Sequence, residues 1–488
     1  MKKYIVSIDL GTTLIKFGIY DLGLAGVCIH SIGYSLNINF CFVEFNAEEY
    51  WNLCKKGIKG LLEKSKINPK DILCITLSSQ AETLIVLDSG GRPLRNAISW
   101  LDSRSAKEVK LLKENFDVGE GYKITGQPDI VTTWPITKIL WIKRNEKGIF
   151  KKAYKFLLLK DYIIYRFTGK FKSEFTIYNF SYYLNIIKKS YYKSMLDFAG
   201  IEESQLPELI EPGESAGVLT SKNIKEFGFS NDIQLNTGCL DQMAGMIGTG
   251  NIKPGIISET TGTVLVICTM TVKPLINKYK IPCHYNAIKD TYVLLPIAES
   301  GGISLEWFKN NFCSDMHYSE IDKEVDAIKA GPLNPIFLPY ITGINAPEYN
   351  TGAKGVFYGI NISHKRQHFA KAIMESIAFM LKKNLDYMKK LNISSEKIIS
   401  AGGGAKSKVW CQMKADILEK EIVVTDSREA ASLGAAILAT VQLGYFKDIN
   451  EAVSKIVKVK KSYIPTPSDY YRKQYNEFLD IYNKLFSI

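Results

Sequence analysis

The fold of this chain is decided near its start by the stretch Tyr4-Ile-Val-Ser-Ile-Asp-Leu-Gly-Thr-Thr-Leu-Ile-Lys-Phe-Gly-Ile-Tyr20. Two apolar runs rich in β-branched residues flank a Gly-Thr-Thr turn, and this pattern predicts a strand, a tight turn and a second strand. Glycine lets backbone N–H groups approach an anion closely, and the threonines add hydroxyl donors. The turn is therefore a candidate phosphate site, although an ordinary hairpin turn explains the tripeptide alone equally well. Its candidate contacts are Gly11, Thr12, Thr13 and Lys16.

The second half of the chain repeats this pattern. Residues 256–270 again predict a strand, a turn and a strand, and Glu259-Thr-Thr-Gly-Thr263 parallels Asp9-Leu-Gly-Thr-Thr13. Internal duplication is the most economical explanation. Two such turns in different halves predict a nucleotide held between two domains, at residues 1–248 and 249–488. The candidate contacts in the second turn are Thr261, Gly262 and Thr263.

Strand-like and helix-like segments alternate along the rest of the chain, which predicts an α/β layer architecture. A length of 488 residues also favours two domains over one. Expected strands cover residues 71–77, 84–87 and 397–401, and expected helices cover 46–64, 103–114, 155–167, 363–390, 406–419 and 428–440.

The basic surplus of the chain does not form a nucleic-acid motif. Lysine and arginine number 62 against 50 acidic residues, which gives a net charge of +12. A nucleic-acid binder usually gathers such charge into a stripe or tail, whereas these lysines are scattered. The densest group alternates with apolar residues in a helix-like pattern, so a solvated surface is expected and no nucleic-acid partner. That group is Lys151, Lys152, Lys155 and Lys160.

Cysteine usage and hydropathy favour a cytoplasmic protein without a membrane partner. None of the nine cysteines forms a Cys-x-x-Cys pair, and several lie in apolar strands, so buried reduced thiols are expected. Asp9 interrupts the first apolar run too early for a secretory signal. No run approaches the ~20 apolar residues of a membrane span.

A run of three glycines, Gly402-Gly403-Gly404, lies between an expected strand and an expected helix. A helix N-terminus favours an anion at that place, so the run is a further candidate for nucleotide contact. A structural turn with left-handed backbone is the alternative. The sequence contains neither a Walker A loop nor a dinucleotide-binding glycine fingerprint.

Together these motifs resemble the FGGY family of carbohydrate kinases over essentially the whole chain. The residues that carry the resemblance are Asp9-Leu-Gly-Thr-Thr-Leu-Ile-Lys16, Pro135-Ile-Thr-Lys-Ile-Leu-Trp-Ile-Lys-Arg-Asn145, Gly355-Val-Phe-Tyr-Gly-Ile360 with His368-Phe-Ala-Lys-Ala-Ile-Met-Glu375, and Ala401-Gly-Gly-Gly-Ala-Lys-Ser407 with Trp410 and Asp416. The resemblance implies two actin-like ATPase (ribonuclease H-like) domains flanking a deep cleft. It also implies transfer of the γ-phosphate of ATP to a sugar hydroxyl.

The resemblance assigns the catalytic base to Asp241, in the segment Thr237-Gly-Cys-Leu-Asp-Gln-Met-Ala-Gly245. Asp241 would accept the proton of the substrate hydroxyl, and Mg²⁺ would be shared near Asp9 and Asp241. Taken alone, an aspartate after a glycine is more often a helix N-cap, and the two roles are compatible. Further residues that the resemblance places near the nucleotide are Gly302, Glu306, Gly403 and Ser407.

The substrate segments implied by the resemblance are residues 79–83 and 100–104. Glycerol kinases carry an arginine where this chain has Ala81 and a tyrosine where it has Thr133, so hydrogen-bond donors for a small triol are missing. Xylulokinases usually carry a histidine where this chain has Glu82. Structural pairing of Asp102 with Arg104 is the alternative to a role in substrate binding. The candidate substrate contacts are Gln80, Ala81, Glu82, Trp100, Asp102 and Asp241.

We therefore expect an ATP-dependent kinase acting on a ketopentose or related polyol, with xylulose as the leading single substrate. Glycerol kinase or another polyol kinase of the family is the main alternative. An actin-like ATPase without sugar kinase activity is a remoter one, because such proteins lack the signatures quoted above. A homodimer is a possible assembly.

Overall fold

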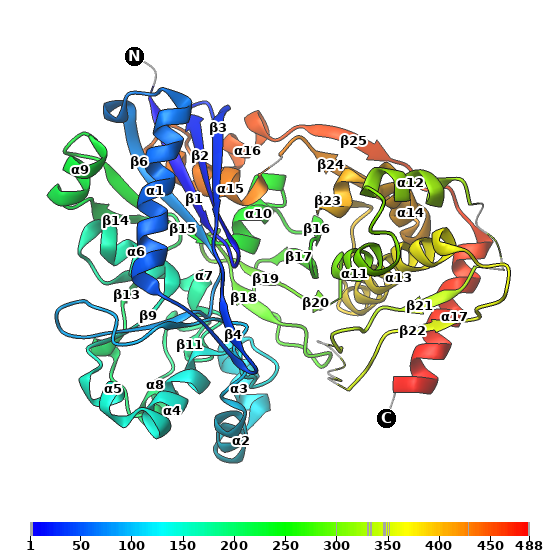
Figure 1. Ribbon diagram of the computed structural model, residues 1–488, viewed down its shortest axis with the longest axis horizontal. Helices are drawn as coiled ribbons and strands as arrows, with labels where there is room; N and C mark the ends of the chain where they lie inside the picture. Colours follow the sequence, from blue (N-terminus) through cyan, green and yellow to red (C-terminus); the bar gives the residue numbers. More distant parts are fainter. Residues whose placement is uncertain are drawn as a thin grey trace.

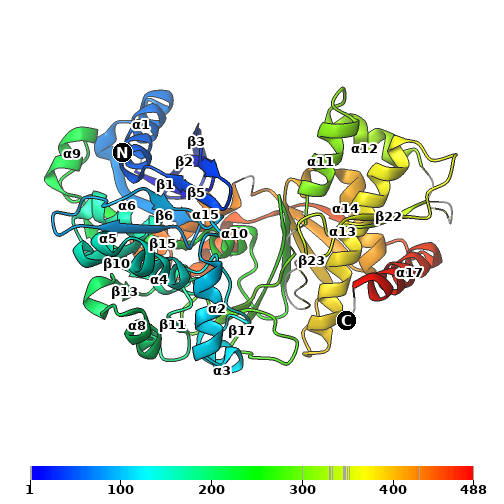
Figure 2. The ribbon, with the colours of Figure 1, turned by 60° about the horizontal axis from the view of Figure 1, so that its bottom comes forward.

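The computed structural model describes residues 3–298, 300–328, 331, 334–344, 348, 350, 352–427 and 429–486. Two large sheets lie in different halves of the molecule (Figures 1 and 2). Arg428, the expected first residue of a helix, lies outside the described residues.

The first sheet is built around the opening hairpin. Its strand order is β14-β15-β6-β1-β2-β3, and β1 runs antiparallel to β2 but parallel to β6, as β6 does to β15. The carboxyl ends of β1, β6 and β15 therefore meet at one edge. The strands are β1 (Tyr4–Leu10), β2 (Leu14–Asp21), β3 (Gly26–Gly33), β6 (Ile72–Ser79), β14 (Ser215–Val218) and β15 (Gln234–Leu240).

Alternation along β1 and β2 decides what each face of this sheet meets. Val6, Ile8, Ile15 and Phe17 point into an apolar core shared with helices α1 (Ala47–Ser65) and α6 (Leu159–Thr168). On the other face, helix α15 (Ala430–Gln442) packs against the sheet, where Ile5 shares an apolar cluster with Ala439 and Tyr20 bonds Ser432. Helix α15 comes from the second half of the chain, yet it lies beside β1 in Figure 1.

The second sheet repeats the plan of the first. Its order is β18-β19-β17-β16-β23-β24-β25 with β20 beside β17, and β16 is antiparallel to β17 but parallel to β23. Helices α13 (Arg366–Lys389) and α14 (Lys408–Leu418) lie beside it in the right half of Figure 1. The strands are β16 (Ile257–Thr261), β17 (Leu265–Thr271), β18 (Cys283–Tyr285), β19 (Tyr292–Leu294), β20 (Ile297–Ala298), β23 (Lys397–Gly402), β24 (Glu421–Thr425) and β25 (Val459–Tyr463).

A five-stranded sheet, β4-β5-β8-β7-β9, extends the first half. Its strands are β4 (Asn37–Asn39), β5 (Phe42–Phe45), β7 (Leu84–Leu87), β8 (Ala97–Ile98) and β9 (Lys155–Leu158). Three two-stranded sheets pair β10 (Lys172–Glu174) with β13 (Glu208–Ile210), β11 (Leu184–Asn185) with β12 (Ser190–Tyr191), and β21 (Ile336–Leu338) with β22 (Val356–Tyr358). Further helices are α2 (Ala106–Asn115), α3 (Val118–Thr125), α4 (Pro135–Asn145), α5 (Lys147–Lys152), α7 (Phe175–Tyr178), α8 (Lys193–Ala199), α9 (Ser221–Phe227), α10 (Asp241–Thr249), α11 (Ile303–Phe312), α12 (Tyr318–Asp326), α16 (Ile449–Ile456) and α17 (Asp469–Phe486).

The helix expected at 155–167 is wrong in its first turn. Lys155–Leu158 forms strand β9, which pairs with β7, and the helix begins at Leu159. The solvated surface expected for the lysine group is present at Lys151 and Lys152, which are exposed, but not at the other two lysines. Lys160 is fully buried and ion-paired with Glu174, while the ammonium of Lys155 donates to the carbonyl of Leu206 at 3.0 Å. Both cations have partners supplied by distant segments, which the local pattern does not reveal.

The predicted cysteine chemistry agrees with the structure. All nine cysteines are free thiols, and seven of them are buried. Among the helices of the described residues, none is both long enough and apolar enough to cross a membrane.

Candidate active site

The opening turn brings candidate phosphate and substrate residues into contact. Trp100 Nε1 donates to Thr12 Oγ1 at 3.0 Å, and Thr12 Oγ1 donates to Gln80 Oε1 at 3.1 Å. The amide nitrogen of Gln80 lies 3.5 Å from the carbonyl oxygen of Gly11. The Thr13 carbonyl accepts from the Tyr34 N–H at 3.1 Å, which holds the other side of the turn. One hydrogen-bond network thus joins two groups that the sequence places almost 90 residues apart.

The register of the three parallel strands brings Asp9 and Asp241 to the same sheet edge. Asp9 of β1 pairs with Ser78 of β6, and Ser78 pairs with Cys239 of β15, two residues before Asp241. Gly238 has a φ of 58° and passes so close to β6 that an added Cβ would lie 1.6 Å from the carbonyl oxygen of Leu77. Only glycine fits this crossing, so the position of Asp241 depends on it.

Asp241 is the first residue of helix α10, whose N-cap is Leu240. The expectation that Asp241 itself caps the helix is therefore wrong. Its Oδ1 accepts from the N–H of the adjacent Gln242 at 2.6 Å. A position in the first helical turn favours negative charge.

The two carboxylates have unusual proton affinities. Burial, followed by the nearby Asp9 carboxylate, raises the pKa of Asp241 to about 7. Burial also raises the pKa of Asp9, although the hydrogen bond from Ser78 Oγ at 2.9 Å opposes the rise. Two partly buried carboxylates that repel each other form a hard-oxygen pair of the kind that Mg²⁺ favours. Within the described part of the chain, no three His, Cys, Asp or Glu side chains gather closely enough to hold a metal by themselves.

The candidate substrate segment 79–83 connects β6 to β7. Glu82 in it has a φ of 64°, a left-handed conformation that is rare for a side chain of this size. Backbone strain of this kind persists only where the surroundings enforce it, and it concentrates at functional sites. Ala81 beside it is buried, with 4 % of its surface exposed.

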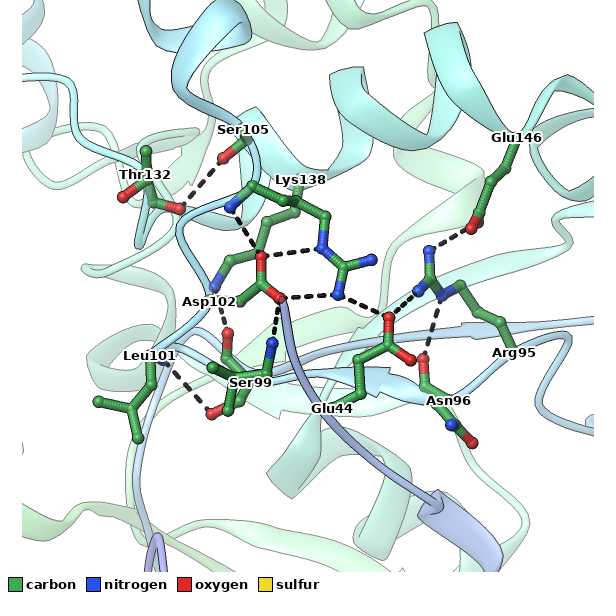
Figure 3. Close-up of polar contacts among 12 residues, drawn as sticks. Glu44, Arg95, Asn96, Ser99, Leu101, Asp102, Ser105, Thr132, Lys138 and Glu146 are labelled. Carbon is green, nitrogen blue, oxygen red and sulfur yellow. Dashed lines mark hydrogen bonds and ion pairs between the residues drawn. The ribbon is translucent and has the colours of Figure 1, made fainter. Parts of the chain in front are cut away.

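Asp102 lies in a buried ionic cluster (Figure 3). Its oxygens accept from Arg104 Nε at 2.9 Å, from an Arg104 terminal nitrogen at 2.7 Å and from the Val43 N–H at 2.6 Å. Arg104 also pairs with Glu44, which pairs in turn with Arg95. The ion pair between Asp102 and Arg104, which was the alternative to a role in substrate binding, is therefore present. A role in substrate binding stays a prediction.

Lys138, in the family segment Pro135–Asn145, is buried next to this cluster (Figure 3). Its ammonium donates to the carbonyls of Ser99 at 2.8 Å and Thr133 at 2.9 Å. Burial lowers the pKa of Lys138 to about 7, against the opposing charges of Glu82 and Asp102. Lys138 was not among the predicted site residues, although the family segment contained it.

The second turn is held by backbone contacts. The Gly302 N–H donates to the carbonyl of Gly262 at 2.7 Å, and the Glu306 N–H donates to that of Gly302 at 2.9 Å as α11 begins. Gly402 has a φ of 79° and approaches Thr261, where an added Cβ would lie 2.7 Å from the Thr261 carbonyl oxygen. The left-handed turn proposed as the alternative for the glycine run is therefore present at Gly402.

The remaining members of the second group adjoin the same turn. Gly404 lies against the Thr261 side chain, and Gly403 lies at ordinary contact distance from the Thr261 carbonyl oxygen. Ser407 caps α14, since its Oγ accepts from the Trp410 N–H at 3.1 Å. The two turns with the glycine run thus form two compact groups, one on each sheet.

Two charged residues near these groups were missed. Lys414 of α14 is fully buried and pairs with Glu259 at 2.6 Å. Glu429, just before α15, pairs with Lys16 at 2.8 Å. Lys16 and Glu429 are 413 residues apart, and no local pattern connects them.

Comparison with known proteins agrees with this architecture. Residues 4–248 match the N-terminal domain, and residues 258–443 the C-terminal domain, of the FGGY family of carbohydrate kinases. The chain therefore belongs to this family and has its mixed α/β, two-domain fold with actin-like ATPase domains. It is a carbohydrate kinase, a phosphotransferase with an alcohol group as acceptor, in a family whose members use ATP. Both the fold class and the resemblance expected from the sequence are confirmed.

The chain is similar to kinases with different substrates. Xylulose kinase of Bacillus subtilis is 28% identical, with 99% of this chain and 97% of the relative covered. Gluconokinase of the same organism is 30% identical, with coverage of 99% and 96%. The solved structure of ligand-bound xylulose kinase from Lactobacillus acidophilus is 29% identical and has a TM-score of 0.92, covering 99% of both chains.

Proposed function

We propose that this kinase transfers the γ-phosphate of ATP to a hydroxyl of a ketopentose or a related neutral sugar, with D-xylulose as the leading substrate. The proposal depends chiefly on Asp241, a partly buried carboxylate whose pKa of about 7 suits a general base. It is supported by the network that joins Gln80 and Trp100 to the opening turn.

In the proposed reaction, Asp241 accepts the proton of the substrate hydroxyl while the hydroxyl oxygen attacks the γ-phosphorus in line. Phosphoryl transfer depends mainly on positioning and charge stabilisation. Backbone N–H groups and hydroxyls of the two turns hold the phosphates, and Lys16 contributes a positive charge. Asp9 and Asp241 would hold Mg²⁺ together with water and phosphate oxygens, and the ion would supply charge neutralisation on the phosphates.

A neutral sugar is favoured over a sugar acid by the cations of the candidate substrate region. Arg104 is already paired with Asp102 and Glu44, and Lys138 already donates to two backbone carbonyls. A substrate carboxylate would have to compete with these partners. Gluconate remains the second candidate because of the similarity to a gluconokinase.

Glycerol is expected to be a poor substrate. The side chain of Ala81 carries no hydrogen-bond donor, and the Thr133 carbonyl already accepts from Lys138. A site that leaves substrate hydroxyls unpaired loses transition-state binding. Because the chain belongs to a carbohydrate kinase family, the alternative of a non-catalytic actin-like ATPase is no longer needed.

The test is a coupled ADP-release assay with D-xylulose, D-ribulose, D-gluconate and glycerol. We expect the highest kcat/KM for a ketopentose and the lowest for glycerol. A higher kcat/KM for gluconate than for either ketose would overturn the neutral-sugar argument, and a higher value for glycerol would overturn the roles given to Ala81 and Thr133.

Three wider features belong to the same proposal. The nine free cysteines fit a reducing compartment, so we place the protein in the cytoplasm. A domain boundary at residues 248/249 fits the end of α10 at Thr249 and the start of β16 at Ile257. A homodimer stays a prediction, to be tested by sedimentation.

A further inference from the structure

Helix α15 connects the second half of the chain to the first hairpin. The hydroxyl of Tyr20 donates to Ser432 Oγ at 3.0 Å, and Thr76 Oγ1 donates to the Ala435 carbonyl at 3.1 Å. Gly18 allows this approach, because an added Cβ would lie 2.8 Å from Ser432 Oγ. The first turns of α15 are thus fixed against β2 and β6.

A glycine crossing with α10 fixes α15 from the other side. A Cβ added to Gly434 would lie 1.8 Å from the Ala244 carbonyl oxygen, and one added to Gly248 would lie 2.0 Å from that of Ala430. Such close backbone packing leaves little freedom for the start of α15. Glu429, the residue before Ala430, is therefore held at a defined place beside the first hairpin.

Glu429 precedes Ala430 and meets Lys16 at this place. Its Oε2 lies 2.8 Å from Lys16 Nζ, and the two side chains are 34% and 35% exposed. In the backbone register of the hairpin, Lys16 lies opposite Asp9, close to the candidate phosphate turn. The charge available there for an anion is shared with a carboxylate from the second half of the chain.

We propose that Glu429 is a positioning residue that competes with the nucleotide phosphates for Lys16 and so weakens nucleotide binding. This inference depends on the proposed role of Lys16 as a phosphate contact. In the absence of nucleotide, Glu429 holds the ammonium in place. When nucleotide phosphates bind, the Glu429 carboxylate repels them and competes with them for the Lys16 ammonium.

The test is direct binding of ADP, without sugar, by titration calorimetry. Glu429→Gln keeps the shape of the side chain and removes its charge. We expect the Kd for ADP to fall about fivefold, the change that ~1 kcal/mol of a partly exposed ion pair produces. The fall should shrink as salt concentration rises. The matched control is Glu421→Gln. It breaks an ion pair with Lys397 on the second sheet and should leave the Kd for ADP unchanged.

A double-mutant cycle separates competition from structural loss. Lys16→Met should weaken ADP binding, and adding Glu429→Gln to it should change the Kd no further. An increased or unchanged Kd for ADP in Glu429→Gln alone would overturn the inference. A fall in Kd that Glu429→Gln still causes in the Lys16→Met background would overturn it as well. Sugar phosphorylation by the parent protein, measured in the ADP-release assay, tests the proposed function separately from this result.

Discussion

In the hairpin β1–β2, Asp9 lies opposite Ser78 of the parallel neighbour β6, and in the hairpin β16–β17, Glu259 lies opposite Ser400 of β23. Both serines donate to the carboxylate that they face. The two halves therefore match in hairpin, neighbouring strand and serine contact, which is strong structural support for the internal duplication expected from the sequence.

The two carboxylates differ in what neutralises them. Glu259 also accepts from Lys414 at 2.6 Å and from Thr261 Oγ1 at 2.7 Å, and Lys414 donates to Thr261 as well. Asp9 has no directly bonded cation among the described residues, because Lys16 is paired with Glu429. The second carboxylate thus holds its own turn in shape, whereas the first stays available for chemistry together with Asp241.

The largest effect is expected where the first region is broken. Asp241→Asn should lower kcat by about 10²–10⁴-fold, because a general base is lost, while the Kd for ADP changes little. Steady-state kinetics and calorimetry measure both quantities. A variant that keeps more than about a tenth of the parent kcat would show that the base is another group.

Breaking the second region should affect stability instead. Lys414→Met leaves Glu259 as an unpaired buried charge and should lower the free energy of unfolding by roughly 3–5 kcal/mol. Urea unfolding measures the loss. The control is Lys397→Met, which removes one partner of an ion pair whose lysine is exposed and should cost less than about 1 kcal/mol. Similar losses of unfolding free energy in the two variants would mean that the buried ion pair stabilises the fold no more than the exposed one.

A pH profile tests the raised pKa of Asp241. Because the pKa of Asp241 is about 7, kcat should fall as pH drops below 7 and the base becomes protonated. The raised pKa also means that folded protein holds a proton that the unfolded chain releases, so stability falls as pH rises from about 4 towards 7. Asp241→Asn should therefore raise the melting temperature relative to the parent more at pH 8 than at pH 5. The opposite order would contradict the burial argument.

The smallest effect concerns how the two hairpins meet. Candidate phosphate contacts are divided between them, while Gln80 and Trp100 belong to the first half. Transfer should therefore require closure about residues 245–255, and closure also excludes water. Small-angle scattering should show a lower radius of gyration with sugar and nucleotide, and ATP hydrolysis without sugar should be slow. An unchanged radius, together with hydrolysis as fast as sugar phosphorylation, would contradict this.

Local sequence determined the elements that carry the site. Two apolar runs around Gly11 predicted the first hairpin, and the recurrence of this pattern around Gly262 predicted the second. The same pattern also sends Lys16 and Tyr20 to the face opposite the α1 core. These features need only neighbouring residues, because alternation and turn geometry act within a few positions of the chain.

Only the tertiary structure decided which charges are neutralised. It paired Lys160 with Glu174, Arg104 with Asp102, Lys414 with Glu259 and Lys16 with Glu429. It also turned Lys155–Leu158 into a strand, because β7 offered a free edge for pairing. The last two ion pairs join residues separated by 155 and 413 positions. Such partners meet through the packing of helices on sheets, which short-range sequence patterns do not encode.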